Sequence, residues 1–468
     1  MTSPLRLRAQ GSGTERRGPL TAAQEQLLAL DRRTSRPRVC NLSYAVGIDG
    51  PLDVAVLADA FAGVVGRHEP LRTTYDGDEA VVGDAELGLA GIDLEPRPVR
   101  DLEEAAALAE AEREAGFDLS REGPLRTSLL RLEEERHVLL LTLHHIAADG
   151  WTLRLLCEEL SRRYAGEPVA PGPEGDCIDH ARWQHDWLES PAAARELEWW
   201  LDRLRDTSPR LAGQPSVEMR RQVVVLPDAL TAELRRFGRE AVVSVFALLV
   251  TAFEILVARS AEVDEPVVGT LAANRPTPLA ARILGAHYNP LLLATDLGGD
   301  PTLAECVLRV GEGTVRALDH QTLPYGRLVA ELGWDGTRVP AAMLLLDRYP
   351  VEELRLAGCR VEGLNLPGPS IPAATTADLS FFVREVGDRL TLSAFYPVGA
   401  LEDDLAVALM GGYAGVLDAM TATPELALGE VDPFGEARPA GPEAPGLYEI
   451  STVAPAEALS PVGRFDDW

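Results

Sequence analysis

The stretch that most constrains the fold of this chain is residues 137–152, which read HVLLLTLHHIAADGWT. Its apolar run at positions 138–143 has the length and composition of a buried strand. A glycine closes a short turn after it, and apolar residues then recur at helical spacing as far as Tyr164. His144 and His145 are therefore predicted to lie on a strand-to-helix turn, where one imidazole can be held inside while the other faces an opening.

The side chains of this turn suit proton transfer. Histidine is the residue whose ordinary pKa fits a general base near neutral pH, so an imidazole here could deprotonate an incoming amine or hydroxyl. Asp149 could cap the helix or brace the loop through a charge pair. The alternative interpretation is structural, with a buried histidine pair and an N-cap aspartate. Two adjacent histidines followed by Asp-Gly at this spacing are rare by chance, and we therefore favour the functional interpretation.

Length and charge limit the classes of protein to which the chain can belong. A chain of 468 residues suits two domains of roughly 200 residues each. The net charge of -29 argues against nucleic acid and against an anionic membrane surface as partners. All 44 basic residues are arginine, which excludes Schiff-base or P-loop chemistry by a lysine of this chain.

The cysteines and the two ends of the chain indicate the cellular compartment in which the protein is expected. The five cysteines have no metal-ligand or redox-motif spacing, which favours buried thiols in a reducing cytoplasm. Residues 1–18 contain arginines but no apolar segment, so we expect a disordered lead-in and no secretory signal. Residues 433–468 are rich in proline, glycine and acidic residues and are predicted to form a loosely ordered tail. We expect a cytoplasmic protein, and no metal-ligand constellation stands out.

One nearly apolar run, residues 241–258, is long enough to suggest a membrane span. Glu254 interrupts it, and a helix buried in a large core needs the same composition. We assign this run to the core and keep a membrane span as the alternative.

The rest of the chain alternates strand and helix patterns, which predicts an α/β protein. The most Pro- and Gly-rich internal stretch, residues 165–176, is the predicted domain boundary. The predicted helices are 19–32, 51–65, 102–115, 189–204 and 405–420, and the predicted strands are 41–48, 222–226, 266–270 and 390–396.

The histidine turn resembles the His-His-x-x-x-Asp-Gly signature of the chloramphenicol acetyltransferase-like acyltransferases, whose largest branch is the condensation domain of nonribosomal peptide synthetases. Two further segments resemble the first two condensation-domain motifs, and the resemblance extends over roughly residues 19 to 420. The matching residues are Thr21, Ala23, Gln24, Arg67, His68, Glu69, Leu71, Arg72 and Thr73.

The second half resembles the family more weakly. Residues 267–275 match a Val-Gly-Thr-x-x-x-Asn-Arg segment that ends at Arg275, whereas residues 335–340 are a degenerate copy of another motif. Residues 284–293 resemble a Gly-x-Phe-Val-Asn-Thr motif, in which His287 and Tyr288 stand in place of Phe and Val. Partial matches also occur at Asp179, Ala181, Trp183, His320, Gln321, Pro324 and Tyr325.

The resemblance implies a fold and a domain organisation. It predicts two chloramphenicol acetyltransferase-like subdomains that form a V-shaped pseudo-dimer, with the active site between them. The first subdomain would comprise residues 19–168 and the second residues 169–432.

The resemblance also implies roles for particular residues. His145 would deprotonate or orient the acceptor nucleophile, while His144 and Asp149 hold the loop and Gly150 lets the backbone approach the reacting carbonyl. Asp149 would pair with Arg275 as a structural brace. Arg72 is expected near the entrance of the substrate tunnel, and His287, Tyr288 and Asn289 along its wall.

The reaction implied by the resemblance joins an acyl or aminoacyl thioester, carried on the phosphopantetheine of a carrier protein, to an amine or alcohol. The partners would be a peptidyl or acyl carrier protein and a small molecule, with no other cofactor. Because carrier and adenylation motifs are missing, we expect a free-standing condensation enzyme of natural-product biosynthesis. The alternatives are an acyl-CoA-dependent acyltransferase of the same superfamily and a catalytically silent recruitment domain.

Overall fold

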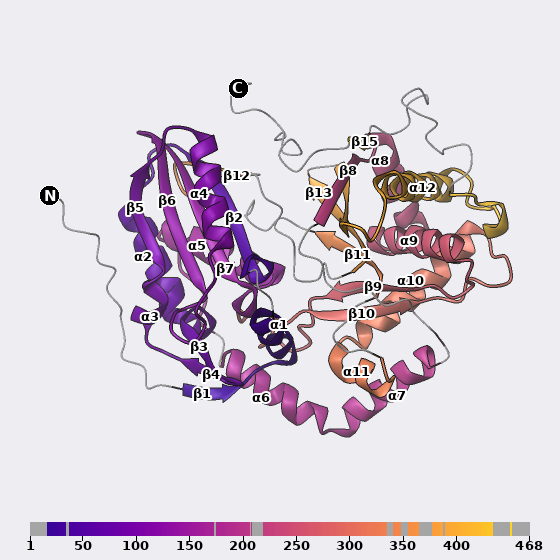
Figure 1. Ribbon diagram of the computed structural model, residues 1–468, viewed down its shortest axis with the longest axis horizontal. Helices are drawn as coiled ribbons and strands as arrows, with labels where there is room; N and C mark the ends of the chain where they lie inside the picture. The colour runs from indigo at the N-terminus through magenta and orange to yellow at the C-terminus, as the bar shows by residue number, and fades with distance from the viewer. Residues whose placement is uncertain are drawn as a thin grey trace.

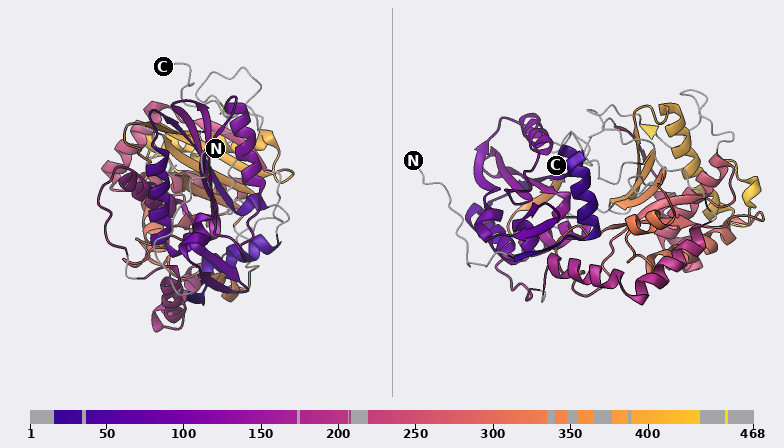
Figure 2. Two further views of the ribbon diagram at one scale, coloured as in Figure 1. Left: turned by 90° about the vertical axis from the view of Figure 1, so that its left-hand side faces the viewer. Right: turned by 60° about the horizontal axis from the view of Figure 1, so that its bottom comes forward.

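A computed structural model describes residues 16–33, 37–172, 175–205, 207, 219–334, 340–347, 354–364, 377–386, 389–433 and 450–451. Two α/β halves stand side by side as the arms of a V, the first coloured indigo to purple and the second pink to yellow in Figure 1. Helices α6 (Cys177–Leu188) and α7 (Pro191–Leu204) run along the base of the V beneath both halves, as Figure 2 also shows. The predicted α/β class and the two-armed shape are confirmed.

The first half is built on a sheet with the strand order β12-β2-β7-β6-β5 among the described residues. Strand β7 lies in its middle, and every residue from His137 to His144 is buried. Alternate β7 side chains point to opposite faces, which explains this continuous apolar run: Leu139, Leu141 and Leu143 pack with α2 and α5, whereas Val138 and Leu140 pack beneath α4. The elements are β2 (Asn41–Asp49), α2 (Val54–Arg67), β5 (Ile92–Pro98), α4 (Leu102–Glu114), β6 (Leu125–Glu133), β7 (Arg136–His144), α5 (Gly150–Tyr164) and β12 (Arg360–Leu364).

A small layer closes the lower end of the first half. A sheet of the order β1-β4-β3 packs there with the first helix, α1. Thr21 and Gln24 cap α1 reciprocally, because each side chain accepts a hydrogen bond from the other residue's backbone N–H. The elements are β1 (Arg16–Pro19), α1 (Ala22–Arg33), η1 (Pro37–Cys40), η2 (Glu69–Arg72), β3 (Thr73–Asp76), β4 (Glu79–Val82), α3 (Ala85–Leu89) and η3 (His145–Ala147).

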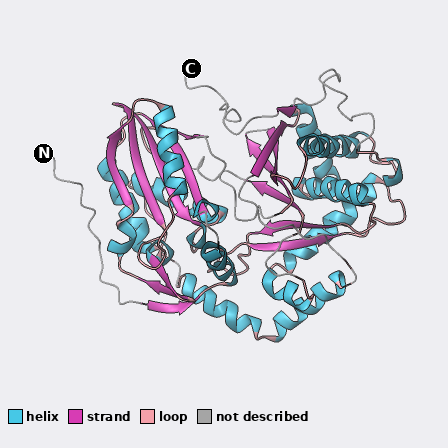
Figure 3. Ribbon diagram, viewed as in Figure 1, coloured by secondary structure: helices cyan, strands magenta, loops and turns pink. Residues whose placement is uncertain are grey.

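The second half is built on a larger sheet with the order β10-β9-β11-β13-β14-β8-β15 within the described ranges. Helices α9, α10 and α12 cover one of its faces, as Figure 3 shows by the separation of cyan helices from magenta strands. The elements are β8 (Met219–Val225), α8 (Asp228–Ala241), α9 (Val245–Ala261), β9 (Val267–Ala272), β10 (Asn289–Ala294), α10 (Leu303–Asp319), α11 (Tyr325–Glu331), β11 (Ala342–Asp347), β13 (Leu379–Val386), β14 (Arg389–Pro397), α12 (Asp403–Ala422), η5 (Leu428–Glu430) and β15 (Ile450–Ser451).

The apolar run at 241–258 forms most of α9, and its residues from Ala247 to Leu256 are all buried in the second core. The assignment of this run to the core is therefore confirmed. Among the described residues α12 is long and apolar enough to cross a membrane, and α8 with α9 reaches that criterion only as a pair bent by 104°. Because α12 packs on α9 and half of its apolar window is buried, core packing explains its composition.

Several predictions about the chain's organisation need correction. Residues 16–18, expected to be disordered, lie in β1, which pairs with β4. Strand β12, expected in the second subdomain, pairs with β2 and so completes the first sheet. Residues 450–451 of the predicted tail pair with β8, whereas residues 1–15 and the remainder of the tail after position 433 lie outside the described residues.

Candidate active site

The histidine turn joins the end of β7 to the start of α5, as predicted. His145 is buried, and its Nδ1 lies 2.7 Å from the carbonyl oxygen of Ala148. A carbonyl oxygen only accepts, so the proton is on Nδ1 and Nε2 is the unprotonated nitrogen. Burial lowers the pKa of His145 from its ordinary value, and the nearby charge of Asp149 opposes this shift only in part. The ring is therefore neutral at pH 7, the state that a general base requires.

His144 is held the other way round. Its Nδ1 accepts a hydrogen bond of 3.1 Å from the backbone N–H of Ile146, so in the neutral ring the proton is on Nε2. That nitrogen faces Asp31, whose Oδ1 lies 3.4 Å away without the alignment of a hydrogen bond. His144 is 1% exposed and also packs edge-on against Phe117. The two neighbouring histidines thus carry their protons on opposite nitrogens, and His144 is a holding residue by its contacts.

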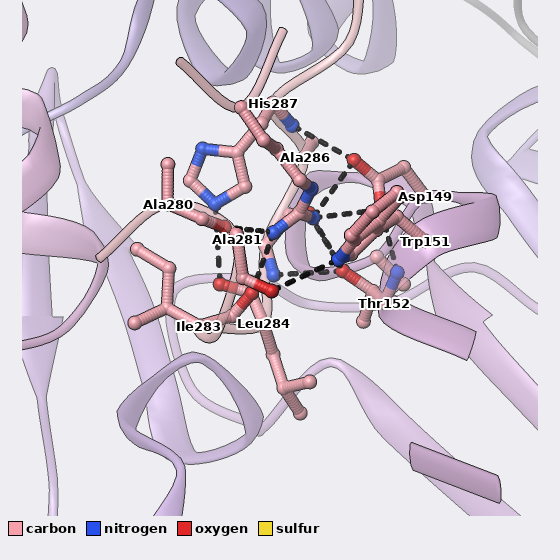
Figure 4. A network of polar contacts seen from close by, with 12 residues as sticks. Asp149, Trp151, Thr152, Ala280, Ala281, Ile283, Leu284, Ala286 and His287 are labelled. Carbon is pink, nitrogen blue, oxygen red and sulfur yellow. Dashed lines mark hydrogen bonds and ion pairs between the residues drawn. The ribbon is translucent and has the colours of Figure 1, made fainter. Parts of the chain in front are cut away.

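Asp149 and Arg275 form the predicted ion pair between the two halves. Arg275 Nη2 lies 2.9 Å from Oδ1 and 3.1 Å from Oδ2 of the carboxylate, and both side chains are almost fully buried. Asp149 also accepts hydrogen bonds from the backbone N–H groups of Thr152 and His287. It therefore caps α5 and holds the second half at the same time, as Figure 4 shows.

The guanidinium of Arg275 is the centre of this network. It donates to the carbonyl oxygens of Ala280, Ile283 and Gly285 and to the hydroxyl of Thr152. Burial lowers the pKa of Arg275, and the charge of Asp149 opposes that shift. A buried charge with this many hydrogen bonds is held in one position. Removal of Asp149 or Arg275 would leave the charge of the other buried without a partner.

Gly285 lies in the loop that contacts α5, at a position with no room for a side chain. Gly285 has a φ of +134°, a region that side chains rarely adopt, and a Cβ built there would lie 2.8 Å from Nε2 of His287. Its carbonyl accepts from the Thr152 hydroxyl at 2.8 Å, and its N–H donates to the same oxygen at 3.0 Å. The match to the family glycine at this position therefore has a physical reason.

The four residues predicted to line a tunnel have different contacts. Tyr288 lies beside the histidine turn, with its ring centroid 5.0 Å from that of His145. His287 is buried behind it and donates from Nε2 to the carbonyl of Leu284. The Asn289 amide donates to the carbonyls of Gln321 and Leu323 and accepts from the N–H of Tyr325, so it clips α11 to the sheet. Arg72 donates to the carbonyl of Gly83 and so fixes the start of α3.

Sequence reasoning gave no role to several residues that hold the loop. Gln24 donates to the carbonyl of Ile146 and to the hydroxyl of Tyr75, so the capped start of α1 supports the turn directly. Trp151 donates to the carbonyl of Ala281 and thereby adds a second link between the halves. The capping pattern at Thr21 and Gln24 was a signal for the first contact, whereas nothing in the sequence pointed to Asp31 beside His144.

Asp31, Cys40 and His144 form a cluster in which the possible ligand atoms lie within 4.8 Å of one another. Its chemistry fits a metal poorly, because a metal on Nε2 of His144 would require the ring proton on Nδ1, which already accepts a hydrogen bond from the backbone N–H of Ile146. The contacts of this cluster suit support of the loop.

A family model described as the condensation domain matches residues 14–438, which is most of the chain. The chain belongs to the condensation domain family. Chondramide synthase cmdD of Chondromyces crocatus is 29% identical over 439 residues, which cover 88% of this chain but 11% of that protein. The chain thus spans a small part of the curated relatives it matches.

Solved structures support the same fold. The X-domain from teicoplanin biosynthesis aligns with a TM-score of 0.76 at 25% identity, over 91% of this chain and 99% of that one. The condensation domain of the Monacolin K polyketide synthase MokA aligns with a TM-score of 0.75 at 18% identity, over 88% and 99% of the two chains. The predicted two-subdomain architecture of condensation domains is confirmed.

Proposed function

We propose that this condensation domain is an active acyltransferase that joins a carrier-bound acyl or aminoacyl thioester to an amine or alcohol. The observation that carries the proposal is the hydrogen bond from Nδ1 of His145 to the carbonyl of Ala148, because it leaves Nε2 as an unprotonated base. The proposed reaction begins at Nε2 of His145. Nε2 takes the proton of the acceptor as its nitrogen or oxygen attacks the thioester carbonyl. The new C–N or C–O bond forms, the C–S bond breaks, and the proton passes to the leaving thiol.

The other residues of the turn act on the position of His145. His144 fixes the backbone at Ile146, and the Asp149–Arg275 pair fixes the start of α5. A Cβ built at Gly150 would meet no described atom within 4 Å, so packing does not require glycine there. We infer that the space beside Gly150 serves the approach of the reacting carbonyl, as the resemblance to the family predicts. The carrier phosphopantetheine would be the only prosthetic arm involved, and we propose a cytoplasmic setting.

The test is an intact-mass assay of a carrier protein loaded with an acyl thioester, incubated with the protein and a panel of amines and alcohols. Loss of the acyl group from the carrier, with formation of the matching amide or ester, is expected for the wild type. His145→Ala should reduce the rate by about 10²- to 10⁴-fold. His137→Gln, at the far end of β7, is the control and should retain activity. Full activity in a folded His145→Ala variant would refute the general-base assignment.

A second candidate function is recruitment of a partner protein without catalysis. One observation favours it, since the teicoplanin X-domain shares this fold and is also known in a complex with OxyB. An inert wild-type protein in the assay above, across the whole acceptor panel, would favour recruitment. Consumption of the same acyl group from CoA but not from the carrier would instead favour an acyl-CoA-dependent transferase.

A further inference from the structure

A small pocket lies next to Tyr288, the residue whose ring contacts His145. It is formed by the start of α1, by α6, by residues 287–289 and by Asn274 and Pro324. Tyr288 belongs to this lining and also contacts the His145 ring. The pocket and the proposed base therefore share Tyr288 as a neighbour, so a group bound in the pocket lies near the reacting atoms.

The lining contains polar atoms that have no hydrogen-bond partner within the described residues. Nδ1 of His180, Nδ1 of His287 and Oδ1 of Asn274 are all unpartnered, and the three side chains are between 2% and 4% exposed. Buried polar atoms are almost always satisfied in folded proteins, since each unmade hydrogen bond is costly. Three such atoms around one pocket indicate that something else completes them.

The hydrogen-bonding capacity of these atoms identifies the ligand chemistry. Nε2 of His287 donates to the carbonyl of Leu284, so its Nδ1 can only accept, and the amide oxygen of Asn274 is an acceptor as well. Figure 4 shows the His287 ring beside the network with a drawn contact at only one of its nitrogens. Nδ1 of His287 and Oδ1 of Asn274 therefore each need a hydrogen-bond donor from the ligand, which a carboxylate cannot supply.

The charges around the pocket further restrict which ligands it can bind. Burial, and then the positive charge of Arg275, lower the pKa of His180 to about 4 and the pKa of His287 well below its ordinary value. Both imidazoles therefore stay neutral and offer no countercharge. The same guanidinium charge disfavours an ammonium group next to it. An uncharged donor meets both conditions, and a hydroxyl is one that can also accept a hydrogen bond if His180 carries its proton on Nδ1.

The aromatic setting holds the pocket in shape. The His180 ring stacks on Trp183 with centroids 5.2 Å apart and meets the His287 ring edge-on at 4.7 Å. Two positions of this cluster, 287 and 288, are those at which the chain departs from the Phe-Val pair of the family motif. The departure replaces apolar side chains by a hydrogen-bonding surface.

We propose that this pocket, lined by His180, His287 and Asn274, is a subsite that recognises an uncharged hydroxyl group of the small-molecule acceptor. The proposal rests on the proposed function for the role of that ligand as a substrate, but binding itself does not require catalysis. The recognised hydroxyl is a second group on the acceptor, distinct from the nucleophile that approaches His145.

Binding is tested first, in the His145→Ala protein, so that turnover plays no part. The probes are pairs that differ by one hydroxyl: serinamide with alaninamide, and tyramine with phenethylamine. Calorimetry should find the hydroxylated member of at least one pair bound about tenfold or more tightly. His287→Phe and His180→Phe should abolish that preference, whereas His287→Asn, which keeps an acceptor near the position of Nδ1, should restore part of it. The control is His320→Phe, whose ring stacks on Trp199 at 4.0 Å outside the pocket.

Kinetics on the same pairs separates the two proposals. With the loaded carrier, the wild type should prefer the hydroxylated acceptor in kcat/KM by a similar factor, and His287→Phe should lose the preference while it still converts the deoxy acceptor. If the protein prefers the hydroxylated probe in binding but catalyses no condensation, the proposed function is refuted. The assignment of the pocket as a hydroxyl-binding site is then retained. Condensation with no hydroxyl preference for either pair, or a preference unchanged in both Phe variants, would overturn the pocket assignment.

Discussion

At the scale of single residues, backbone partners distinguish two identical neighbouring side chains. His144 accepts from the N–H of Ile146, and His145 donates to the carbonyl of Ala148, so the two rings carry their protons on opposite nitrogens. Each hydrogen bond lies within the short turn itself. The division between the holding histidine and the proposed base is therefore built into the conformation of the loop, and it depends on the contacts that keep that loop in place.

The Asp149–Arg275 pair is the strongest such constraint, and its energetic role can be measured. Asp149→Asn and Arg275→Met should each lower the free energy of unfolding by about 3–5 kcal/mol, because each strands a buried partner. The double variant should lose less than the sum of the two. Urea unfolding of the four proteins gives the coupling. Arg236→Met, at an exposed ion pair, is the control and should leave the unfolding midpoint nearly unchanged. Additive losses in the double variant would mean that the pair is not coupled.

At the scale of elements, the site is a contact between a helix start and a tight loop. The first turn of α5 presents the Thr152 hydroxyl, and the loop that precedes β10 presents both backbone polar groups of Gly285 to it. A side chain at that glycine would meet both His287 and Cys177. The element contact thus positions the wall residues 287 and 288 relative to His145.

Gly285→Ala should therefore displace this wall. The positive φ and the close Cβ contact predict a loss of about 1–3 kcal/mol in the free energy of unfolding. We expect condensation activity to fall about tenfold or more, because a small misplacement near the reacting groups is costly. Gly150→Ala is the matched comparison, since a Cβ there meets no described atom and stability should be unchanged. A Gly285→Ala protein that matches the wild type in both measurements would contradict this role of the loop.

At the scale of the whole molecule, sequence predicted what is local and periodic. The apolar β7, the turn and the amphipathic α5 follow from residue order alone, and so does the N-cap role of Asp149. The pairing of Asp149 with Arg275 joins positions 126 residues apart, and only the family resemblance suggested it. The placement of β12 in the first sheet could not be predicted, because the sequence of a five-residue strand does not indicate which strand it pairs with. The sequence does not predict the pocket at His180 for the same reason, since its walls come from five separate segments.

The stability of the whole molecule should depend on pH through its buried titratable groups. Burial raises the pKa of Glu254, inside α9, to about 8, so between the ordinary glutamate pKa and pH 8 the folded state holds a proton that the unfolded state has lost. The free energy of unfolding should therefore fall as the pH rises through that window. Buried histidines such as His145 and His287 have lowered pKa values, so stability should also fall as the pH drops below the ordinary histidine value.

Glu254→Gln isolates the alkaline side of this profile, because the amide resembles the protonated acid and never ionises. We expect the variant to be more stable than the wild type at pH 8, by an amount on the order of a few kcal/mol, and the difference to shrink toward pH 5. Urea unfolding at intervals from pH 5 to 9 measures it. Glu425→Gln, at an exposed carboxylate, should leave the profile unchanged. If the free energy of unfolding depends on pH in the same way for the wild type and Glu254→Gln, the carboxyl group is ionised to the same extent in the folded and unfolded states. Burial of the charged carboxylate in the second core would then cost no stability.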